Sequence, residues 1–317
     1  MTISKILSGE IQSSIDLCVT ALMDGRLIGM PTETVYGLGG DATNPLAIAA
    51  IFESKGRPRF NPLISHVANL EMAMREGEFS PLALKLGYAF WPGPLTLVLP
   101  RRSTSQICDL ACAGLPTVAL RVPAHSQALT LLSAFDRPVA APSANISGRP
   151  SPTTAQHVRD EMGEMVGPIL DGGSCSIGLE SAVVAVSGDQ ATLLRLGGLA
   201  RADIEAISGP LLSPTASDLS APASPGMLLR HYAPKAPVGL DQTHAKIGEI
   251  LLGFGAIESD PTFNLSPSGD LREASANLFA FLRRADSLNP SRISIAPVPN
   301  FGLGEAINDR VRRAAKG

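Results

Sequence analysis

The sequence predicts an α/β protein in which a mixed, twisted sheet with flanking helices precedes a second, smaller α/β domain. Three observations predict this architecture. Short apolar runs alternate with helical stretches over residues 11–207, a proline-rich stretch without periodicity covers 208–237, and a shorter helix-and-strand alternation follows. We therefore expect a first domain at 1–207, a linker at 208–237 and a second domain at 238–317.

Strand and helix patterns alternate through the first domain. A helix is expected at 45–54, because Asn44 is a favoured N-cap residue and Pro45 suits the first helical position. A hairpin is expected where strands 182–186 and 192–195 flank turn residues. Further strands are expected at 27–30, 63–67, 95–99, 117–122 and 138–141.

The N-terminal 25 residues interleave charged and apolar side chains, which predicts an amphipathic helix and not a signal peptide. In the second domain we expect helices at 246–252, 271–285 and 304–315, with extended segments at 253–257 and 292–296. No apolar run approaches the roughly 20 residues that span a bilayer. The sequence thus predicts a cytoplasmic protein that does not contact a membrane.

Composition excludes several classes of function. The formal net charge of −3 disfavours a polycation that coats nucleic acid, although a local basic cleft stays possible. The cysteines Cys18, Cys108, Cys112 and Cys175 form no C-x-x-C pair, so a zinc site or disulfide framework is poorly supported. Reduced, mostly buried thiols are the simpler interpretation.

The standard nucleotide motifs are missing. The chain has no G-x-x-x-x-G-K-[ST], and the glycines at 37–40 do not form G-x-G-x-x-G. A P-loop ATPase and a dinucleotide oxidoreductase are therefore disfavoured. If ATP binds, cationic side chains and backbone donors must hold it.

Three segments offer groups suited to anions. Lys55, Arg57 and Arg59 form a cationic cluster stiffened by prolines, although a solvated basic turn explains them equally well. The run P-S-A-N-I-S-G at 142–148 follows a strand, where ligands of α/β sheets gather, yet it also reads as an ordinary turn. The run P-T-E-T-V-Y-G-L at 31–38 follows another strand, and its Thr34 suits a small polar substrate.

No other set of catalytic residues can be recognised in the sequence. Neither a paired-carboxylate glycosidase site nor a Ser-His-Asp set emerges from the sequence. The histidines His66, His125, His157, His231 and His244 each read more simply as surface or satisfied core residues.

Taken together, these segments resemble a known family. The order P-T-E-T-V-Y-G-L, K-G-R-P-x-x-N-P-L, L-R-V-P and A-P-S-A-N-x-S-G resembles threonylcarbamoyl-AMP synthases built on the YrdC-like domain. The motifs at 224–234, 265–274 and 302–310 resemble the linker and C-terminal domain of the long, two-domain form. The resemblance covers nearly the whole chain. It implies a YrdC-like mixed sheet followed by a small Rossmann-like domain.

The resemblance also implies site residues. Lys55 and Arg57 correspond to the family's cationic catalytic pair, and Tyr232 on the linker is expected to close over the nucleotide. L-threonine is expected at Thr34, His66, Arg121 and Ser181. ATP is expected at Arg57, Asn61, Thr117, Ser143, Asn145, Ser151, Arg195 and Tyr232.

The implied reaction makes L-threonylcarbamoyl-AMP and pyrophosphate from L-threonine, bicarbonate and ATP, for modification of the adenosine 3′ of the tRNA anticodon. Mg²⁺ is expected to be held mainly through phosphates, without protein side chains, zinc, nicotinamide or flavin. Expected partners are the threonylcarbamoyl transferase machinery that acts on tRNA and, weakly, tRNA or double-stranded RNA. The alternative is a double-stranded RNA or tRNA-binding module without catalysis.

Overall fold

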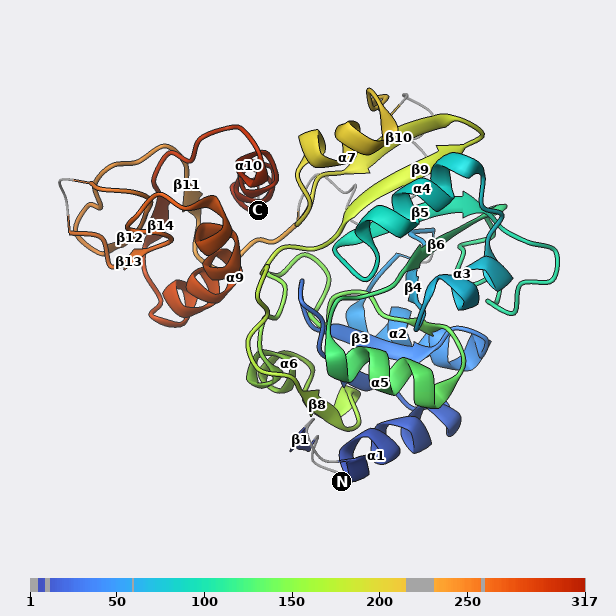
Figure 1. Cartoon of the computed structure of the whole chain (residues 1–317). Coiled ribbons are helices and arrows are strands. Elements are labelled where there is room, and N and C mark those ends of the chain that lie inside the picture. The colour runs from blue at the N-terminus through green and yellow to red at the C-terminus, as the bar shows by residue number, and fades with distance from the viewer. Residues whose placement is uncertain (1–4, 9–11, 59, 215–230, 258–259, 317) are drawn as a thin grey trace.

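The computed structural model describes residues 5–8, 12–58, 60–214, 231–257 and 260–316. It contains a large mixed sheet, followed by a small parallel sheet at the C-terminus (Figure 1). Three predicted features lie outside the described residues: Arg59, the motif start at 224–226 and the apolar run 227–230.

The large sheet combines parallel and antiparallel neighbours in the order β1-β8-β2-β3-β7-β4-β6-β5-β9-β10. The register of β4 and β6 is parallel and pairs His66 with Arg121, so these two side chains leave the sheet at the same end. The strands are β1 (Ile6–Ser8), β2 (Ile28–Met30), β3 (Gly37–Asp41), β4 (Ile64–His66), β5 (Leu95–Pro100), β6 (Thr117–Arg121), β7 (Val139–Ala140), β8 (Ile169–Asp171), β9 (Ala182–Ser187) and β10 (Gln190–Arg195).

Helices cover this sheet because each buries one apolar face. One set packs with Tyr36, Leu38 and Leu97 in the largest core cluster, while α1 and α5 pack together over Ile28, Met30 and Val139 in a second cluster. The helices are α1 (Gln12–Met23), α2 (Pro45–Lys55), α3 (Leu70–Glu76), α4 (Pro81–Phe90), α5 (Ser126–Phe135), α6 (Ala155–Met162) and α7 (Arg201–Ser208), with the 3₁₀ turn η1 (Gly163–Met165).

The small C-terminal domain is a parallel sheet with two helices against it. Its strand order is β11-β14-β12-β13, and its core joins Leu252 and Ile293 of the sheet to Leu278, Leu282 and Ile307 of the helices. The elements are β11 (Val238–Gly239), β12 (Glu249–Gly253), β13 (Phe263–Asn264), α9 (Leu271–Ser287), β14 (Arg292–Ile295) and α10 (Leu303–Ala314).

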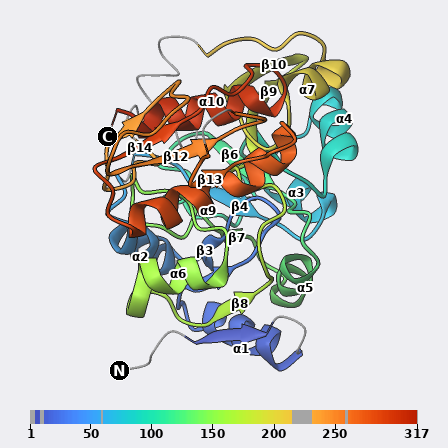
Figure 2. The same cartoon turned by 90° about the vertical axis from the view of Figure 1, so that its left-hand side faces the viewer.

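The two domains pack directly against each other. Val35 and Leu179 of the large domain share an apolar cluster with Tyr232 and with α9 and α10. Figure 2 shows α9 and α10 in front of the elements of the large domain. Gly178, at φ +72°, lets the chain pass α9 closely, since a Cβ there would lie 2.5 Å from the Ser275 carbonyl oxygen. The C-terminal domain is thus held against the segment that leads into β9.

Most of the predicted elements are confirmed. The helix predicted at 45–54 is α2, and Asn44 caps it by accepting a hydrogen bond from the Leu46 N–H at 2.9 Å. The hairpin is β9–β10, and the predicted helices at 271–285 and 304–315 match α9 and α10 to within two residues. The fold class predicted from the sequence is confirmed.

Some local predictions are wrong. The predicted helix at 246–252 is instead occupied by β12, and the extended segment expected at 253–257 overlaps that strand only at Gly253. The run Ile250–Leu252 is buried in a parallel sheet, where strands carry continuous apolar residues and lose the alternation that identifies them. The N-terminal helix is confined to α1, and Ile6–Ser8 is a strand paired with β8.

Candidate active site

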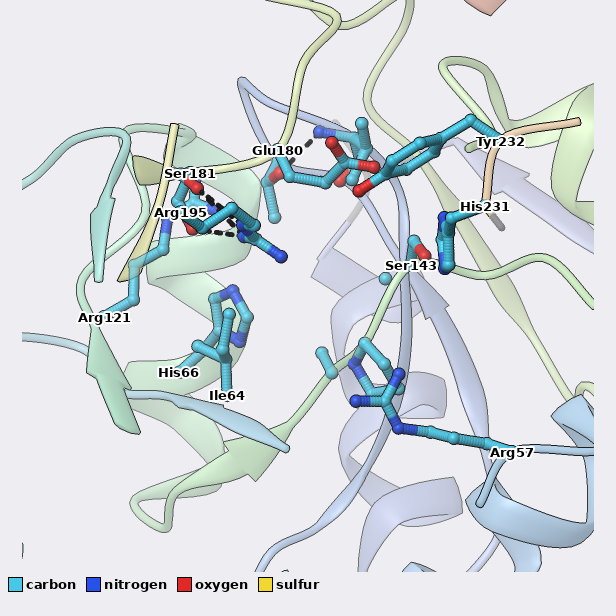
Figure 3. A pocket seen from close by; sticks show the side chains of 15 residues that line it. Arg57, Ile64, His66, Arg121, Ser143, Glu180, Ser181, Arg195, His231 and Tyr232 are labelled. Carbon is cyan, nitrogen blue, oxygen red and sulfur yellow. Dashed lines mark hydrogen bonds between the residues drawn. The ribbon is translucent and has the colours of Figure 1, made fainter. Parts of the chain in front are cut away.

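One cavity opens where the carboxyl ends of β4 and β6 meet the segments that precede β9 and follow β7. Figure 3 shows Arg121, Arg195 and His66 on one side, Arg57 on the other, and Glu180 and Tyr232 along one edge. The described residues that line it are Thr32, Val35, Gly37, Arg57, Ile64, His66, Arg121, Ala141, Pro142, Ser143, Glu180, Ser181, Arg195, His231 and Tyr232.

Arg121 supplies a buried cation held by the large domain alone. Its Nη2 donates to Glu33 Oε1 at 2.6 Å and its Nε donates to the Gly93 carbonyl oxygen at 3.2 Å. Both members of the ion pair are under a tenth exposed. Because two of its nitrogens are already engaged, Arg121 has a fixed orientation toward the cavity, which suits the binding of a carboxylate.

His66 stands beside Arg121 as a neutral imidazole. Burial, with the positive charge of Arg121 as a second cause, lowers the pKa of His66 to about 3. Its Nδ1 is buried and has no hydrogen-bond partner among the described residues. Because His66 lines the cavity, its imidazole is a polar group that a ligand can contact.

Ser181 and Arg195 form one hydrogen-bonded unit. Arg195 donates to the Ser181 carbonyl oxygen from Nε at 3.1 Å and from Nη2 at 2.9 Å, and to Ser181 Oγ at 3.2 Å. Ser181 Oγ also lies 2.7 Å from Thr96 Oγ1. The β9–β10 hairpin explains this contact, since it places Arg195 across from the start of β9.

Arg57 reaches the cavity from the loop after α2. Its Nε and Nη2 donate to the Asn61 and Pro62 carbonyl oxygens at 3.3 and 3.0 Å. Burial, together with the nearby Arg195, lowers the pKa of Arg57 to about 10, so the guanidinium stays charged at neutral pH. Two cations held close together in a buried space favour an anionic ligand.

Lys55 does not line the cavity, although the sequence pairs it with Arg57. Its ammonium group is buried and donates to the carbonyl oxygens of Ser143 and Asn145. Burial lowers the pKa of Lys55 well below its usual value, and the neighbouring Arg57 lowers it further. The structure therefore places Lys55 beneath the 143–145 segment, where it holds the backbone that presents Ser143.

The remaining predicted residues divide into two groups. Ser143 and Tyr232 line the cavity, whereas Thr34, Asn61, Thr117, Asn145 and Ser151 are absent from its lining. Thr34 Oγ1 lies 2.8 Å from Oγ1 of Thr32, which does line it. Thr117 begins β6, at the opposite end of that strand from Arg121.

Comparisons with known proteins agree with this geometry. Residues 20–197 match the Sua5/YciO/YrdC family model, described as telomere recombination, and residues 199–316 match the C-terminal domain model of threonylcarbamoyl-AMP synthase. The threonylcarbamoyl-AMP synthase of Pyrococcus abyssi is 40% identical over 93% of this chain and 92% of its own length. That of Bacillus subtilis is 37% identical over 93% and 91%.

The chain belongs to the threonylcarbamoyl-AMP synthase family. The crystal structure of P. abyssi Sua5 complexed with L-threonine superposes with a TM-score of 0.89 at 36% identity, covering 99% of this chain and 98% of that chain. The predicted family, its two-domain form and its enzyme class are thereby confirmed. The chain is a nucleotidyltransferase of the threonylcarbamoyladenosine pathway of tRNA modification.

Two ionisable residues of the cavity lining, and one residue behind them, were not predicted from the sequence. Glu180 lines the cavity and accepts hydrogen bonds from Ser151 Oγ at 2.5 Å and from Arg310 Nε at 2.9 Å. Burial alone would raise the pKa of Glu180, but Arg310 and Arg195 lower it to about 2. Glu180 directly precedes the predicted Ser181, and Arg310 is the last residue of the motif at 302–310.

His231 is the second missed cavity residue. It was expected to be a surface or satisfied core histidine, and the structure places it on the cavity, where its buried Nδ1 has no hydrogen-bond partner in the part of the chain that the structure describes. Its ring centroid lies 4.0 Å from that of Tyr232, in an edge-to-face arrangement. Tyr232 in turn stacks on Phe279 at 5.4 Å.

Two further searches bear on cofactors and membranes. Among the described residues, no group of three or more His, Cys, Asp or Glu side chains could hold a metal ion. Within the same part of the chain, no helix is long and apolar enough to cross a bilayer.

Proposed function

We propose that the cavity binds L-threonine against Arg121, His66, Ser181 and Thr34, and binds ATP against Arg57, Arg195, Ser143 and Tyr232. Asn61, Asn145 and Ser151 would complete the nucleotide side, and Lys55 would act by holding the 143–145 segment. The observation that carries the proposal is the convergence of three buried guanidinium groups on one cavity. They provide the positive charge that a carboxylate and a triphosphate require together.

In the proposed reaction, the threonine amine combines with bicarbonate to give a carbamate and water. A carbamate oxygen then forms a bond to the α-phosphorus of ATP, and the bond to the pyrophosphate oxygen breaks. Both reactants are anionic, so the residues act by neutralising repulsion and by alignment. Arg121 would hold the threonine carboxylate, while Arg57 and Arg195 would stabilise charge on the phosphates.

Mg²⁺ fits this site as an ion bound through the nucleotide. Glu180 is the only carboxylate among the described residues of the cavity lining, and both its oxygens already accept hydrogen bonds. The metal would then be held by phosphate oxygens and water, and it would neutralise phosphate charge. Zinc, nicotinamide and flavin have no part in the proposed reaction.

The linker is proposed to complete the site. We assign residues 1–207 to the catalytic domain, 208–237 to a linker that acts as a lid, and 238–317 to the C-terminal domain. Support comes from Tyr232, which is 1% exposed and packs between the cavity and α9. A covered site would protect the carbamate and the mixed anhydride from hydrolysis.

The product would pass to the threonylcarbamoyl transferase machinery that acts on the adenosine 3′ of the anticodon, in the cytoplasm. We expect direct binding of tRNA or double-stranded RNA to be weak, because the chain carries a formal net charge of −3.

The test is pyrophosphate release from ATP in bicarbonate buffer with Mg²⁺, with and without L-threonine. We expect release that requires both L-threonine and bicarbonate and that falls at least about 100-fold in Arg57→Ala, as expected when a phosphate clamp is lost. Folded protein that releases no pyrophosphate in response to L-threonine, yet binds RNA in a salt-sensitive way, would support the RNA-binding alternative instead.

A further inference from the structure

Arg310 extends from the C-terminal domain into the wall of the active site. It lies on α10, is 1% exposed and is among the largest fully buried side chains. Its Nε donates to Glu180 Oε2 at 2.9 Å and its Nη2 donates to the Leu196 carbonyl oxygen at 2.8 Å. Glu180 directly precedes Ser181 and Leu196 directly follows Arg195, so one guanidinium contacts both segments that deliver the Ser181–Arg195 unit.

Glu180 needs this partner because it is a buried carboxylate beside an anion-binding site. Its other oxygen accepts the Ser151 hydroxyl at 2.5 Å, and Arg195 is close enough to be a second source of positive charge. Without Arg310, the carboxylate would attract the Arg195 guanidinium and would repel a triphosphate. With Arg310 in place, its charge is balanced from outside the cavity.

The same guanidinium supports Tyr232. The carbon at the centre of the Arg310 guanidinium lies 5.0 Å from the centroid of the Tyr232 ring, within the range of a cation–π contact. Tyr232 is also stacked on Phe279 of α9. Arg310 therefore contacts, directly or through Glu180, three groups to which the proposed function gives a role in ATP binding: Ser151, Arg195 and Tyr232.

We propose that Arg310 is a positioning residue for the nucleotide half of the active site. It neutralises Glu180 from the C-terminal domain, so that Ser151 and Arg195 keep the places in which they receive ATP. The C-terminal domain then contributes a positioning residue to the active site. This inference rests on the proposed function, because it assumes that the cavity binds ATP.

The test measures steady-state pyrophosphate release in Arg310→Met, Glu180→Gln and the double variant. We expect Arg310→Met to lower kcat/KM for ATP at least about 30-fold. The KM for L-threonine should change less than about threefold, because the Arg121–Glu33 pair is untouched and Ser181 keeps its contact with Thr96.

The double variant distinguishes charge balance from simple domain docking. If Arg310 acts by neutralising Glu180, replacing that carboxylate by an amide removes the need for it. Arg310→Met/Glu180→Gln should then regain at least about tenfold of the lost kcat/KM, a non-additive result expected of coupled residues. A double variant as impaired as Arg310→Met, or an Arg310→Met variant with wild-type kcat/KM for ATP, overturns the proposal.

Arg201 provides a matched control. Its Nε pairs with Glu305 of α10 at 3.1 Å, so it joins the same two domains, but its side chain is 35% exposed and lies outside the cavity lining. We expect Arg201→Met to stay within about twofold of wild type, as is usual for exposed pairs. If it matches the loss in Arg310→Met, domain docking explains the effect and the positioning role is wrong.

Folding and the proposed function are checked separately. If Arg310→Met leaves the Glu180 carboxylate unpaired and so fails to fold, the double variant is compared with Glu180→Gln alone. A difference below about threefold supports the proposal and a larger loss overturns it. Absence of threonine-dependent release from the wild-type chain contradicts the proposed function itself, whereas a normal wild type with an unimpaired Arg310→Met contradicts only the positioning role.

Discussion

Two walls of the cavity are built in different ways. The strand wall consists of Ile64, His66 and Arg121 at the ends of β4 and β6, and the buried partner of Arg121, Glu33, belongs to the same domain. The docked wall consists of Glu180, His231 and Tyr232, with Arg310 and Phe279 of the C-terminal domain behind it. Figure 3 shows the docked wall along one edge of the cavity and His66 and Ile64 away from it.

Under the proposed function, the two walls serve different substrates. The strand wall is fixed by the hydrogen-bonded register of a sheet, so it exists whether or not the second domain is in place. The docked wall depends on contacts between two domains and a linker. A small amino acid bound to the strand wall would therefore tolerate displacement of the C-terminal domain, whereas nucleotide binding would not.

L-threonine binding at the strand wall should depend most strongly on Arg121. We expect Arg121→Ala to weaken L-threonine binding by about 100-fold, or about 2.7 kcal/mol, because the wall loses the cation that pairs with a carboxylate. ATP affinity should change less than about threefold. Isothermal titration calorimetry with each ligand measures both. Arg137→Ala, which removes a half-exposed partner of Asp41, serves as control. Unaltered L-threonine affinity in Arg121→Ala would show that the strand wall binds something else.

Lys55 and Arg57 should have different roles, although they are two residues apart. Removing Lys55 leaves the Ser143 and Asn145 carbonyl oxygens without their donor, so Lys55→Met should lower the free energy of unfolding by about 2–4 kcal/mol. Arg57→Met should lose pyrophosphate release and should also lower the stability, because Arg57 donates to the Asn61 and Pro62 carbonyl oxygens. Urea denaturation measures the stability of both variants. Unchanged stability in Lys55→Met would contradict the placement of Lys55 beneath the 143–145 segment.

Replacing Tyr232 in the docked wall should lower kcat/KM for ATP moderately. Tyr232→Ala removes a ring stacked on Phe279 and placed over Arg310. We expect kcat/KM for ATP to fall about tenfold, or about 1.4 kcal/mol, while L-threonine affinity is retained. Tyr232→Phe keeps the ring and should stay within about threefold of wild type. Equal losses in Tyr232→Phe and Tyr232→Ala would assign the effect to the hydroxyl group instead of the ring.

The sequence predicted the strand wall better than the docked wall. The predicted strands at 63–67 and 117–122 contain His66 and Arg121, and the family resemblance assigned both residues to L-threonine. Glu180 was not predicted, since its partner Arg310 is 130 residues away and no periodicity encodes a contact between domains. Arg310 lies in the motif at 302–310, but a motif does not state which distant residue its members meet.

Lys55 shows a second limit. A cationic pair in a short loop suggests that both cations face one ligand, and no local pattern tells which side chain turns inward. The outcome is set by the 143–145 segment, whose carbonyl oxygens need a donor once they are buried. Likewise, β3 was not predicted because its run Gly37–Asp41 contains three glycines, which disfavour strands in isolation. Tertiary context decided both cases.

The last prediction concerns the acid stability of the strand wall. His66 has a folded pKa of about 3 against an ordinary value of 6.5, so the unfolded chain takes up its proton first as the pH falls. Its contribution is therefore fully present above pH 6.5 and is lost progressively below it. Between pH 7 and pH 5 the loss should reach about 2 kcal/mol. Glu180, with a folded pKa of about 2 against 4.5, retains its contribution until the pH falls through 4.5.

His66→Gln tests this assignment, because glutamine removes the titrating ring and keeps a polar side chain. Urea denaturation of both proteins at pH 7 and pH 5 should show a smaller fall in unfolding free energy for His66→Gln. His244→Gln, which alters an exposed histidine of the C-terminal domain, should keep the wild-type fall. If His66→Gln also keeps it, then His66 is not the buried neutral base of the strand wall, and Arg121 alone carries that wall's recognition of L-threonine.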